Sequence, residues 1–202
     1  MEKTVGIIGL GIMGSAMAGN LTEAGFRVVG HDVRREPIDA LVATGGEAAS
    51  SAREVADMTG VVITSLPSIA AFHDIVSGEG GLLHGGAERL IVIETSTLPI
   101  DEKQKGCEAL AAANKILLDC PISGTGAQAR TRDLVVLGSG DQKAFDDCTP
   151  VFEGFARAHF YLGDFGNGSR MKFVANHLVN IHNVAAAEAM VLVTLPLYCP
   201  RL

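Results

Sequence analysis

The sequence predicts an α/β protein in which a doubly wound, mostly parallel sheet is followed by one long C-terminal helix. Three observations support this fold class. Short apolar runs alternate with segments of helical periodicity, which is the order of parallel strands joined by crossover helices. The core must be aliphatic, because 48% of the residues are hydrophobic and only 5% are aromatic. Residues 166–193 have an unbroken helical pattern, which predicts the long helix.

The strands are predicted from short runs of Val, Ile and Leu, as in strands buried on both faces of a parallel sheet. They span residues 5–8, 27–30, 61–64, 90–94, 116–118 and 134–137. The helices between them are predicted from apolar spacing and from end signals, such as Gly25 after the first helix and Pro37 in the first turn of the second. They span residues 12–24, a segment from about residue 37, and residues 69–76, 101–113 and 142–152.

The long C-terminal helix differs from the helices before it. It is rich in Ala and Val and carries few charges, whereas a surface helix normally keeps one polar face. Pro196 and Pro200 prevent its continuation. We therefore divide the chain into a domain of residues 1–165 and a second segment, residues 166–202, whose helix we expect a missing domain or a second copy of the chain to cover.

Charge and cysteine usage narrow the class of protein. The net charge is −7 and no basic cluster exceeds the pair Arg34-Arg35, so we expect neither nucleic acid nor an anionic membrane surface as a partner. No apolar stretch reaches the length of a membrane span. A strand follows directly on the first four residues, which leaves no room for a secretory leader. The four cysteines form no CxxC pair, which predicts reduced thiols, no metal site and a cytoplasmic location.

A G-x-G-x-x-G motif joins the first predicted strand to the first predicted helix. It consists of Gly9, Leu10, Gly11, Ile12, Met13 and Gly14. The first glycine permits a tight turn, the second lets a pyrophosphate approach the backbone, and the third lets helix and strand pack closely. The free N–H groups and the dipole of the helix then bind the phosphates. In this context the motif predicts a dinucleotide bound in a Rossmann-type domain.

Asp32 follows the second predicted strand, where a carboxylate can accept hydrogen bonds from both ribose hydroxyls of NAD. The same negative charge would repel the 2′-phosphate of NADP. Arg34 and Arg35 come directly afterwards and could offset this repulsion, although a solvated approach to the next helix explains them as well. We expect NAD as the cofactor, with NADP the less favoured of the two.

Five segments, in the same order, resemble the β-hydroxyacid dehydrogenases. This family includes 3-hydroxyisobutyrate dehydrogenase and tartronate semialdehyde reductase, with 6-phosphogluconate dehydrogenase as a distant relative. The segments are GLGIMGSAMAGNL from Gly9, SLP from Ser65, ETSTLP from Glu94, DCPISG from Asp119, and GNG from Gly166 followed by Lys172 and Asn176. The resemblance implies that the second and third segments contact the cofactor through Leu66, Pro67, Thr95 and Ser96.

The chemistry of such a family can be assigned to two residues of the long helix. Oxidation of an alcohol needs a hydride acceptor, a base for the hydroxyl proton, and groups that hold the substrate. Lys172 is the candidate acid/base, because burial in a cleft lowers the pKa of a lysine toward the range in which it accepts a proton. Asn176 lies four residues further on and shares its helix face, so both could bind one substrate oxygen. Without the other motifs, a solvent-facing lysine would be the better explanation.

Ser123, Gly124 and Thr125 are the candidate substrate loop, whose hydroxyl and backbone N–H groups can bind a carboxylate. A simple turn would explain the same residues. Thr125 stands where the family usually has a second glycine, and a threonine lacks the backbone freedom of glycine. We therefore expect the carboxylate to be held differently, and the particular hydroxy acid stays open.

Family members continue past the long helix into an all-helical domain that closes the active site, supplies another lysine and forms much of the dimer. Residues 193–202 do not resemble that continuation, so we expect the chain to lack it. Two hypotheses follow. One is an oxidoreductase that transfers a hydride between a small β-hydroxy acid and NAD, as a homodimer formed through the C-terminal helix. The other is a noncatalytic dinucleotide-binding module whose apolar helix docks a partner.

Overall fold

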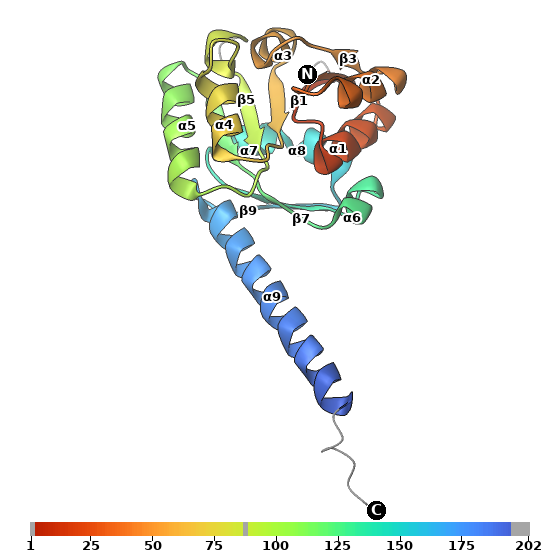
Figure 1. Ribbon diagram of the computed structural model, residues 1–202. Helices are drawn as coiled ribbons and strands as arrows, with labels where there is room; N and C mark the ends of the chain where they lie inside the picture. Colours follow the sequence, from red (N-terminus) through yellow and green to blue (C-terminus); the bar gives the residue numbers. More distant parts are fainter. Residues whose placement is uncertain (1–2, 87–88, 195–202) are drawn as a thin grey trace, which may run out of the picture.

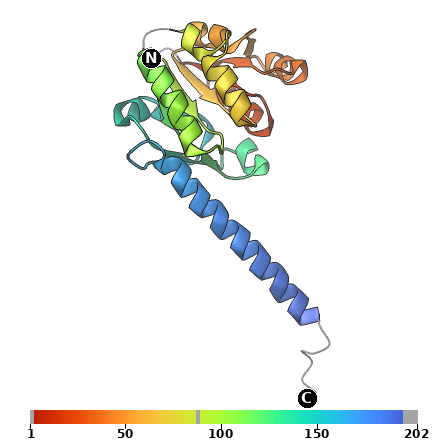
Figure 2. The same cartoon turned by 60° about the vertical axis from the view of Figure 1, so that its left-hand side comes forward.

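The computed structural model describes residues 3–86 and 89–194. A layered α/β body holds all the strands, and the long helix α9 (Asn167–Thr194) projects away from it (Figures 1 and 2). The predicted fold class, a Rossmann-type α/β domain followed by a long helix, is confirmed.

The main sheet has six parallel strands in the order β3-β2-β1-β4-β5-β6. The strands are β1 (Thr4–Ile8), β2 (Arg27–His31), β3 (Glu47–Ala48), β4 (Val61–Thr64), β5 (Ile91–Glu94) and β6 (Ile116–Asp119). Strands β2 and β3 lie in order on one side of β1, and strands β4, β5 and β6 lie in order on its other side. Ligands of such sheets bind at this switch point, beyond the carboxyl ends of the strands.

The strand predicted at residues 134–137 exists, but the expectation that it extends the parallel sheet is wrong. It is β8 (Val135–Gly138), which lies between β7 (Ile122–Ser123), its antiparallel neighbour, and β9 (Ala158–Tyr161), its parallel neighbour. Asp119 and Ser139 exchange two backbone hydrogen bonds of 3.0 and 2.8 Å in an antiparallel bridge. The end of β6 is therefore tied to the second sheet rather than to a seventh parallel strand.

Helices cover both faces of the main sheet (Figure 1). Besides α9 they are α1 (Ile12–Glu23), α2 (Arg35–Ala43), α3 (Ala52–Met58), α4 (Ile69–Ser77), the 3₁₀ helix η1 (Leu82–His84), α5 (Ile100–Ala112), α6 (Gly126–Arg130), α7 (Gln142–Asp147) and α8 (Thr149–Phe155). The single helix predicted at residues 142–152 is wrong, because Cys148 ends α7 and Pro150 lies in the first turn of α8.

The core consists of two clusters, one on each face of the sheet. Alternate residues of the central strands enter different clusters, as the period of two in a strand requires. Ile63 belongs to the cluster that contains Met17 and Phe152, whereas Val62 belongs to the cluster that contains Phe72. The strands are thus buried on both faces, as their aliphatic composition predicts.

Helix α9 is covered only where it starts. Gly168 and Ser169 are its buried residues, and the large apolar side chains that follow are exposed within the described part of the chain. Beyond its first turn, the described residues of this helix are therefore only half-buried or exposed. Among the described residues, no helix is long and apolar enough to cross a membrane.

Candidate functional site

The glycine turn between β1 and α1 has the geometry that the motif predicts. Gly9 has a φ of +89°, and a Cβ atom there would lie 2.2 Å from the carbonyl oxygen of Ser65. A Cβ atom on Gly14 would lie 1.9 Å from the carbonyl oxygen of Gly9, so this glycine permits the close packing of helix on strand. Gly11 has no heavy atom within 4 Å of the corresponding position. Its open side is therefore available to a ligand.

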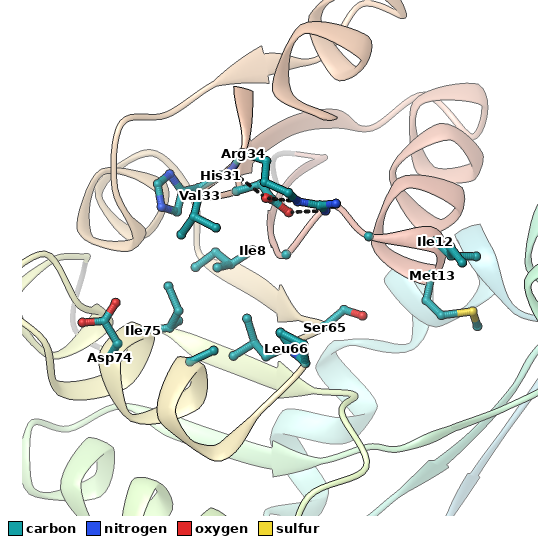
Figure 3. Close-up of a pocket in the computed structure, with 15 residues that line it drawn as sticks. Ile8, Ile12, Met13, His31, Val33, Arg34, Ser65, Leu66, Asp74 and Ile75 are labelled. Carbon is teal, nitrogen blue, oxygen red and sulfur yellow. Dashed lines mark hydrogen bonds and ion pairs between the residues drawn. The ribbon is translucent and has the colours of Figure 1, made fainter. Parts of the chain in front are cut away.

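A cleft of about 600 Å³ lies at the switch point of the sheet. The glycine turn, the segment after β2 and the loop after β4 form its walls, and the side chains of Ile8, Ile75 and Leu66 face it (Figure 3). Most of the predicted cofactor residues meet here: Gly9, Gly11, Ile12, Met13, Asp32, Leu66 and Pro67. A largely apolar slot that ends at exposed helix N–H groups suits a flat base joined to phosphates.

Asp32 is fixed in this cleft by four donors. The backbone N–H of Leu10 and Nη2 of Arg34 donate to Oδ2 at 2.8 and 3.3 Å, and the backbone N–H and Nε of Arg34 donate to Oδ1 at 2.9 and 3.1 Å. Burial by itself would raise the pKa of Asp32, but the hydrogen bonds from Arg34 and Leu10 outweigh it, so the pKa lies below its usual value. The carboxyl group is therefore ionised near neutral pH.

The two arginines after Asp32 have different surroundings. Arg34 lines the cleft and pairs with Asp32, while 62% of its side chain stays exposed. Arg35 forms an ion pair with Asp39 on the surface of α2, at 2.8 Å. Of the two arginines, Arg34 is therefore the one placed to contact a ribose or its phosphate. Arg35 fits the alternative explanation, a solvent-exposed residue at the start of a helix.

Four predicted cofactor residues do not line the cleft. Gly14 and Leu10 belong to the glycine turn, and Thr95 and Ser96 are buried behind the loop that follows β4. The Thr95 hydroxyl donates to the carbonyl oxygen of Thr64 at 2.7 Å, and the Ser96 hydroxyl accepts the N–H of Leu66 at 2.8 Å. In this structure Ser96 therefore supports the cleft wall at Leu66, and its direct contact with the cofactor stays a prediction.

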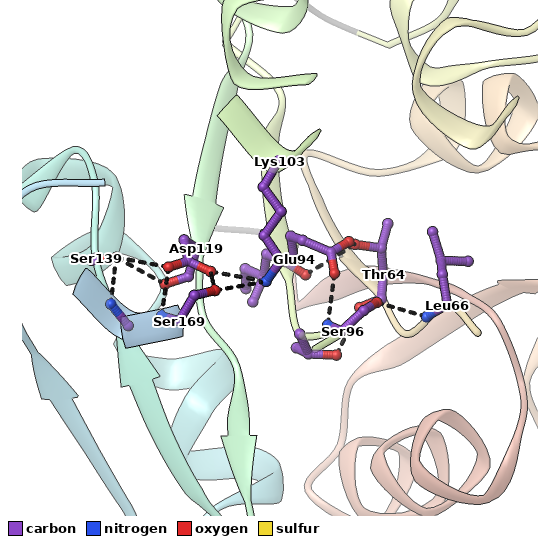
Figure 4. Close-up of polar contacts among 11 residues, drawn as sticks. Thr64, Leu66, Glu94, Ser96, Lys103, Asp119, Ser139 and Ser169 are labelled. Carbon is purple, nitrogen blue, oxygen red and sulfur yellow. Dashed lines mark hydrogen bonds and ion pairs between the residues drawn. The ribbon is translucent and has the colours of Figure 1, made fainter. Parts of the chain in front are cut away.

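Glu94 belongs to the same support. Its buried carboxylate accepts the N–H of Ser96 at 2.6 Å and a hydrogen bond from the Thr64 hydroxyl (Figure 4). The carboxylate thereby connects the ends of β4 and β5.

The predicted substrate loop lies between the second sheet and the glycine turn. Ser123 ends β7, and Gly124 has a φ of +144°, which favours glycine. A Cβ atom on Gly126 would lie 2.7 Å from Cγ2 of Ile12, so the start of α6 approaches the cleft wall.

Thr125 has a backbone conformation that does not require glycine. Its backbone is extended, with a φ of −102° and a ψ of 168°. It is the N-cap of α6 in a capping box with Gln128, whose side-chain oxygen accepts the Thr125 N–H at 2.9 Å. How this loop holds the substrate carboxylate stays a prediction.

Lys172 and Asn176 lie half-buried in the first turns of α9, outside the residues that line the cleft. Burial lowers the pKa of Lys172, and its amine makes no hydrogen bond or ion pair with the described residues. A Cβ atom on the nearby Gly168 would lie 2.2 Å from the carbonyl oxygen of Leu137 and 2.7 Å from that of Asp119. The helix thus starts against the segment that leads into Ser123.

A buried ion pair beside this turn escaped the sequence interpretation. Lys103 Nζ lies 2.9 Å from Oδ1 of Asp119, and both side chains are 0% exposed. One signal could have found it, because Lys103 shares a helix face with the buried Gly106 and Leu110, at spacings of three and seven residues. A lysine on the apolar stripe of a helix needs a buried partner.

Metal ligands and reactive thiols are not part of the described site. No three His, Cys, Asp or Glu side chains are grouped to hold a metal ion in residues 3–86 and 89–194. Cys107, Cys120 and Cys148 are free thiols, and burial raises the pKa of Cys148 to about 12. Cys199 lies outside the described residues.

A parallel sheet that opens at its switch point onto a glycine turn and a buried carboxylate is typical of a dinucleotide-binding protein of the Rossmann class. More particularly, the chain belongs to the family described as the NAD binding domain of 6-phosphogluconate dehydrogenase, whose model matches residues 4–163.

Individual relatives confirm the resemblance to the β-hydroxyacid dehydrogenases. The NAD-dependent L-serine dehydrogenase of Pseudomonas aeruginosa is 35% identical over 190 residues, 94% of this chain and 64% of the relative. The 3-hydroxyisobutyrate dehydrogenase of the same organism is 35% identical over 188 residues, 93% of this chain and 63% of the relative. The structure of Mycobacterium tuberculosis 3-hydroxyisobutyrate dehydrogenase with L-serine matches with a TM-score of 0.89 and 28% identity, over 95% of this chain and 65% of that one. The chain thus spans less than two thirds of the length of these relatives.

Proposed function

We propose that the cleft binds NAD and that the chain is the cofactor-binding part of an oxidoreductase acting on small β-hydroxy acids of the 3-hydroxyisobutyrate type. One observation carries the proposal. Gly11, Asp32 and Leu66, which come from three separate segments, line a single cleft of about 600 Å³ at the switch point of the sheet. In this assignment residues 1–165 form the dinucleotide-binding domain, and residues 166–202 begin a second, helical part of a cytoplasmic homodimer.

The residues of the cleft fit a dinucleotide. Gly11 leaves open space at the N-terminus of α1, where backbone N–H groups favour a pyrophosphate. Asp32 is ionised and accepts the ribose hydroxyls once Arg34 turns aside, which its exposed side chain permits. The carboxylate of Asp32 would repel a 2′-phosphate, a repulsion that Arg34 would offset only in part, so we propose NAD as the preferred cofactor and NADP as a weaker ligand.

Lys172 is the proposed acid/base. When the nicotinamide ring is bound, it accepts or supplies the hydride. Burial lowers the pKa of Lys172, which increases the fraction of neutral amine able to take the proton of the substrate hydroxyl. In the reverse direction the ammonium returns this proton. Asn176 holds the same substrate oxygen, and Ser123, Gly124 and Thr125 hold the carboxylate.

The second candidate function is a noncatalytic dinucleotide-binding module whose apolar helix docks a partner. The observation that favours it is the exposure of α9 after its first turn, which leaves Lys172 outside the cleft lining.

The test is a fluorescence titration with NADH and NADPH, run with turnover assays on a panel of 3-hydroxy acids. Wild type, Lys172→Ala and the control Lys143→Ala are compared, because Lys143 is a surface lysine of α7 that pairs with Asp147. We expect all three to bind NADH with similar affinity, and Lys172→Ala to lose about 100-fold or more in kcat. Equal turnover by Lys172→Ala would exclude the assigned base. NADH binding without turnover by any of them would favour the module.

A further inference from the structure

We propose that the buried ion pair between Lys103 and Asp119 positions Lys172, because together with Ser169 it fixes the first turn of α9 against the sheets. The inference rests on the proposed function and deepens it. It assigns Lys103, Asp119 and Ser169 as positioning residues that act through the helix backbone.

The three residues join separate elements at one point. Lys103 comes from α5, Asp119 ends β6, and Ser169 lies in the first turn of α9 (Figure 4). Lys103 Nζ donates to Asp119 Oδ1 at 2.9 Å and lies 3.3 Å from the Ser169 hydroxyl. The pair therefore touches the long helix directly.

Asp119 and its neighbour Ser139 bind free N–H groups in the first turn of α9. Its Oδ2 accepts the backbone N–H of Ser169 at 2.8 Å, and its Oδ1 accepts the Ser169 hydroxyl at 2.7 Å. The Ser139 hydroxyl donates to Asp119 Oδ2 at 3.2 Å and accepts the backbone N–H of Gly168 at 3.0 Å. Two N–H groups that a helix start leaves without intrahelical partners are thus bound by this cluster.

The fully buried contacts of α9 are confined to its first turn. Lys103 and Asp119 are 0% exposed and Ser169 is 1% exposed, whereas the residues of α9 after Ser169 are half-buried or exposed. A helix held at one end takes its direction from that end. The direction of α9 relative to the cleft is therefore set by the cluster around Asp119.

Lys172 depends on this direction because it has no hydrogen bond or ion pair of its own with the described residues. It lies three residues after Ser169, on the next turn of the same helix. Displacement of a reacting group by about 1 Å can cost about 100-fold in rate. Loosening the first turn should therefore harm catalysis without touching the cofactor cleft.

The experiment compares three variants with wild type. Lys103→Met with Asp119→Asn removes both buried charges together, so that neither is left uncompensated. Ser169→Ala removes only the helix hydroxyl from the cluster. Lys143→Met with Asp147→Asn is the matched control, since it removes a surface ion pair of 3.0 Å on α7.

Four quantities are measured on each protein. They are hydrogen exchange at the amides of residues 168–172, the rate at which an acylating reagent modifies Lys172, the affinity for NADH, and kcat and KM for a hydroxy acid that wild type turns over. In the double variant we expect exchange and acylation to rise about tenfold, with a smaller rise in Ser169→Ala and none in the control. The kcat should fall by about tenfold or more while NADH affinity stays within about twofold.

Unchanged exchange in both Ser169→Ala and the double variant would overturn the inference, as would faster exchange with unchanged kcat and unchanged acylation of Lys172. If the double variant fails to fold, Ser169→Ala decides. If wild type binds NADH but turns over no hydroxy acid, the proposed reaction fails, and the exchange and acylation rates still decide whether the cluster positions Lys172.

Discussion

At the scale of single residues, Gly11, the N-cap of α1, and Gly14, inside that helix, have very different surroundings. A Cβ atom on Gly14 would meet the backbone oxygen of Gly9 at 1.9 Å, whereas one on Gly11 would meet nothing within 4 Å. Gly14→Ala should therefore lower the free energy of unfolding by about 3 kcal/mol, as overpacking against a rigid atom does. Gly11→Ala should cost about 1 kcal/mol or less.

The same two variants should separate folding from binding. Gly11→Ala places its methyl group in the cleft, so we expect NADH affinity to fall by about tenfold, the effect of roughly 1.4 kcal/mol. Thermal unfolding and NADH titration of both variants check this. If folded Gly11→Ala binds NADH as tightly as wild type, Gly11 does not belong to the phosphate site.

Asp32 should make stability depend on pH in a predictable direction. Its pKa in the folded protein lies below the value of about 3.9 in an unfolded chain. Its ionised form therefore stabilises the fold above that value, and the contribution is lost as the pH falls through the folded pKa. Asp32→Asn should be less stable by about 1 kcal/mol at pH 7, a value reduced because its partner Arg34 is largely exposed.

Urea unfolding of wild type and Asp32→Asn at several pH values between 7 and 3 tests this dependence. The difference in unfolding free energy should be constant near neutral pH and shrink toward pH 3. Asp39→Asn, which breaks the surface pair with Arg35, is the control and should show a difference of only a few tenths of a kcal/mol. A difference for Asp32→Asn that grows in acid would show that the pKa is raised instead.

At the scale of elements, the sequence predicts what local patterns determine. The aliphatic runs of β1, β4 and β5 and the glycine turn were found, because each depends on a few neighbouring residues. The two-residue strand β3 is too short to carry a pattern. Helix α3 was missed although Ser51, its N-cap, and Glu54 form the sequence signature of a helix start.

Partners far apart in the chain explain the remaining differences. The strand at β8 was predicted, but periodicity cannot say which sheet a strand joins. In the site, Asp32 was predicted from its place after β2, whereas the pairing of Lys103 with Asp119 needs the packing of α5 on β6 and α9. Local sequence patterns were thus enough to predict the cofactor cleft. The contacts that fix the start of α9 depend on long-range packing and could be found only in the structure.

At the scale of the whole molecule, α9 presents an apolar stripe. Met171, Val174, Leu178 and Ile181 follow the 3-4-3 spacing of one helix face and are all exposed. Folded monomers rarely leave such a patch uncovered. We therefore expect the chain to associate with itself through α9, at concentrations that sedimentation velocity can determine.

Leu178→Glu with Ile181→Glu should shift this equilibrium toward the monomer by about 100-fold or more, because two charges would be buried at the contact. Val42→Glu is the control, since Val42 is an exposed apolar residue of α2, on a different surface. A wild type that sediments as a monomer throughout the micromolar range would contradict association through α9.

Because α9 is fixed at its first turn, a small rotation there moves its far end through a large distance. Its 28 residues extend about 42 Å, so each degree of rotation at the inner end sweeps the outer end through about 0.7 Å. Lys172, close to the pivot, moves far less for the same rotation. A swing of several ångströms at the outer end would therefore move Lys172 by only a fraction of that distance. Because a displacement of about 1 Å is already costly at a reacting group, the angular stiffness of one buried cluster would limit the swing that catalysis tolerates.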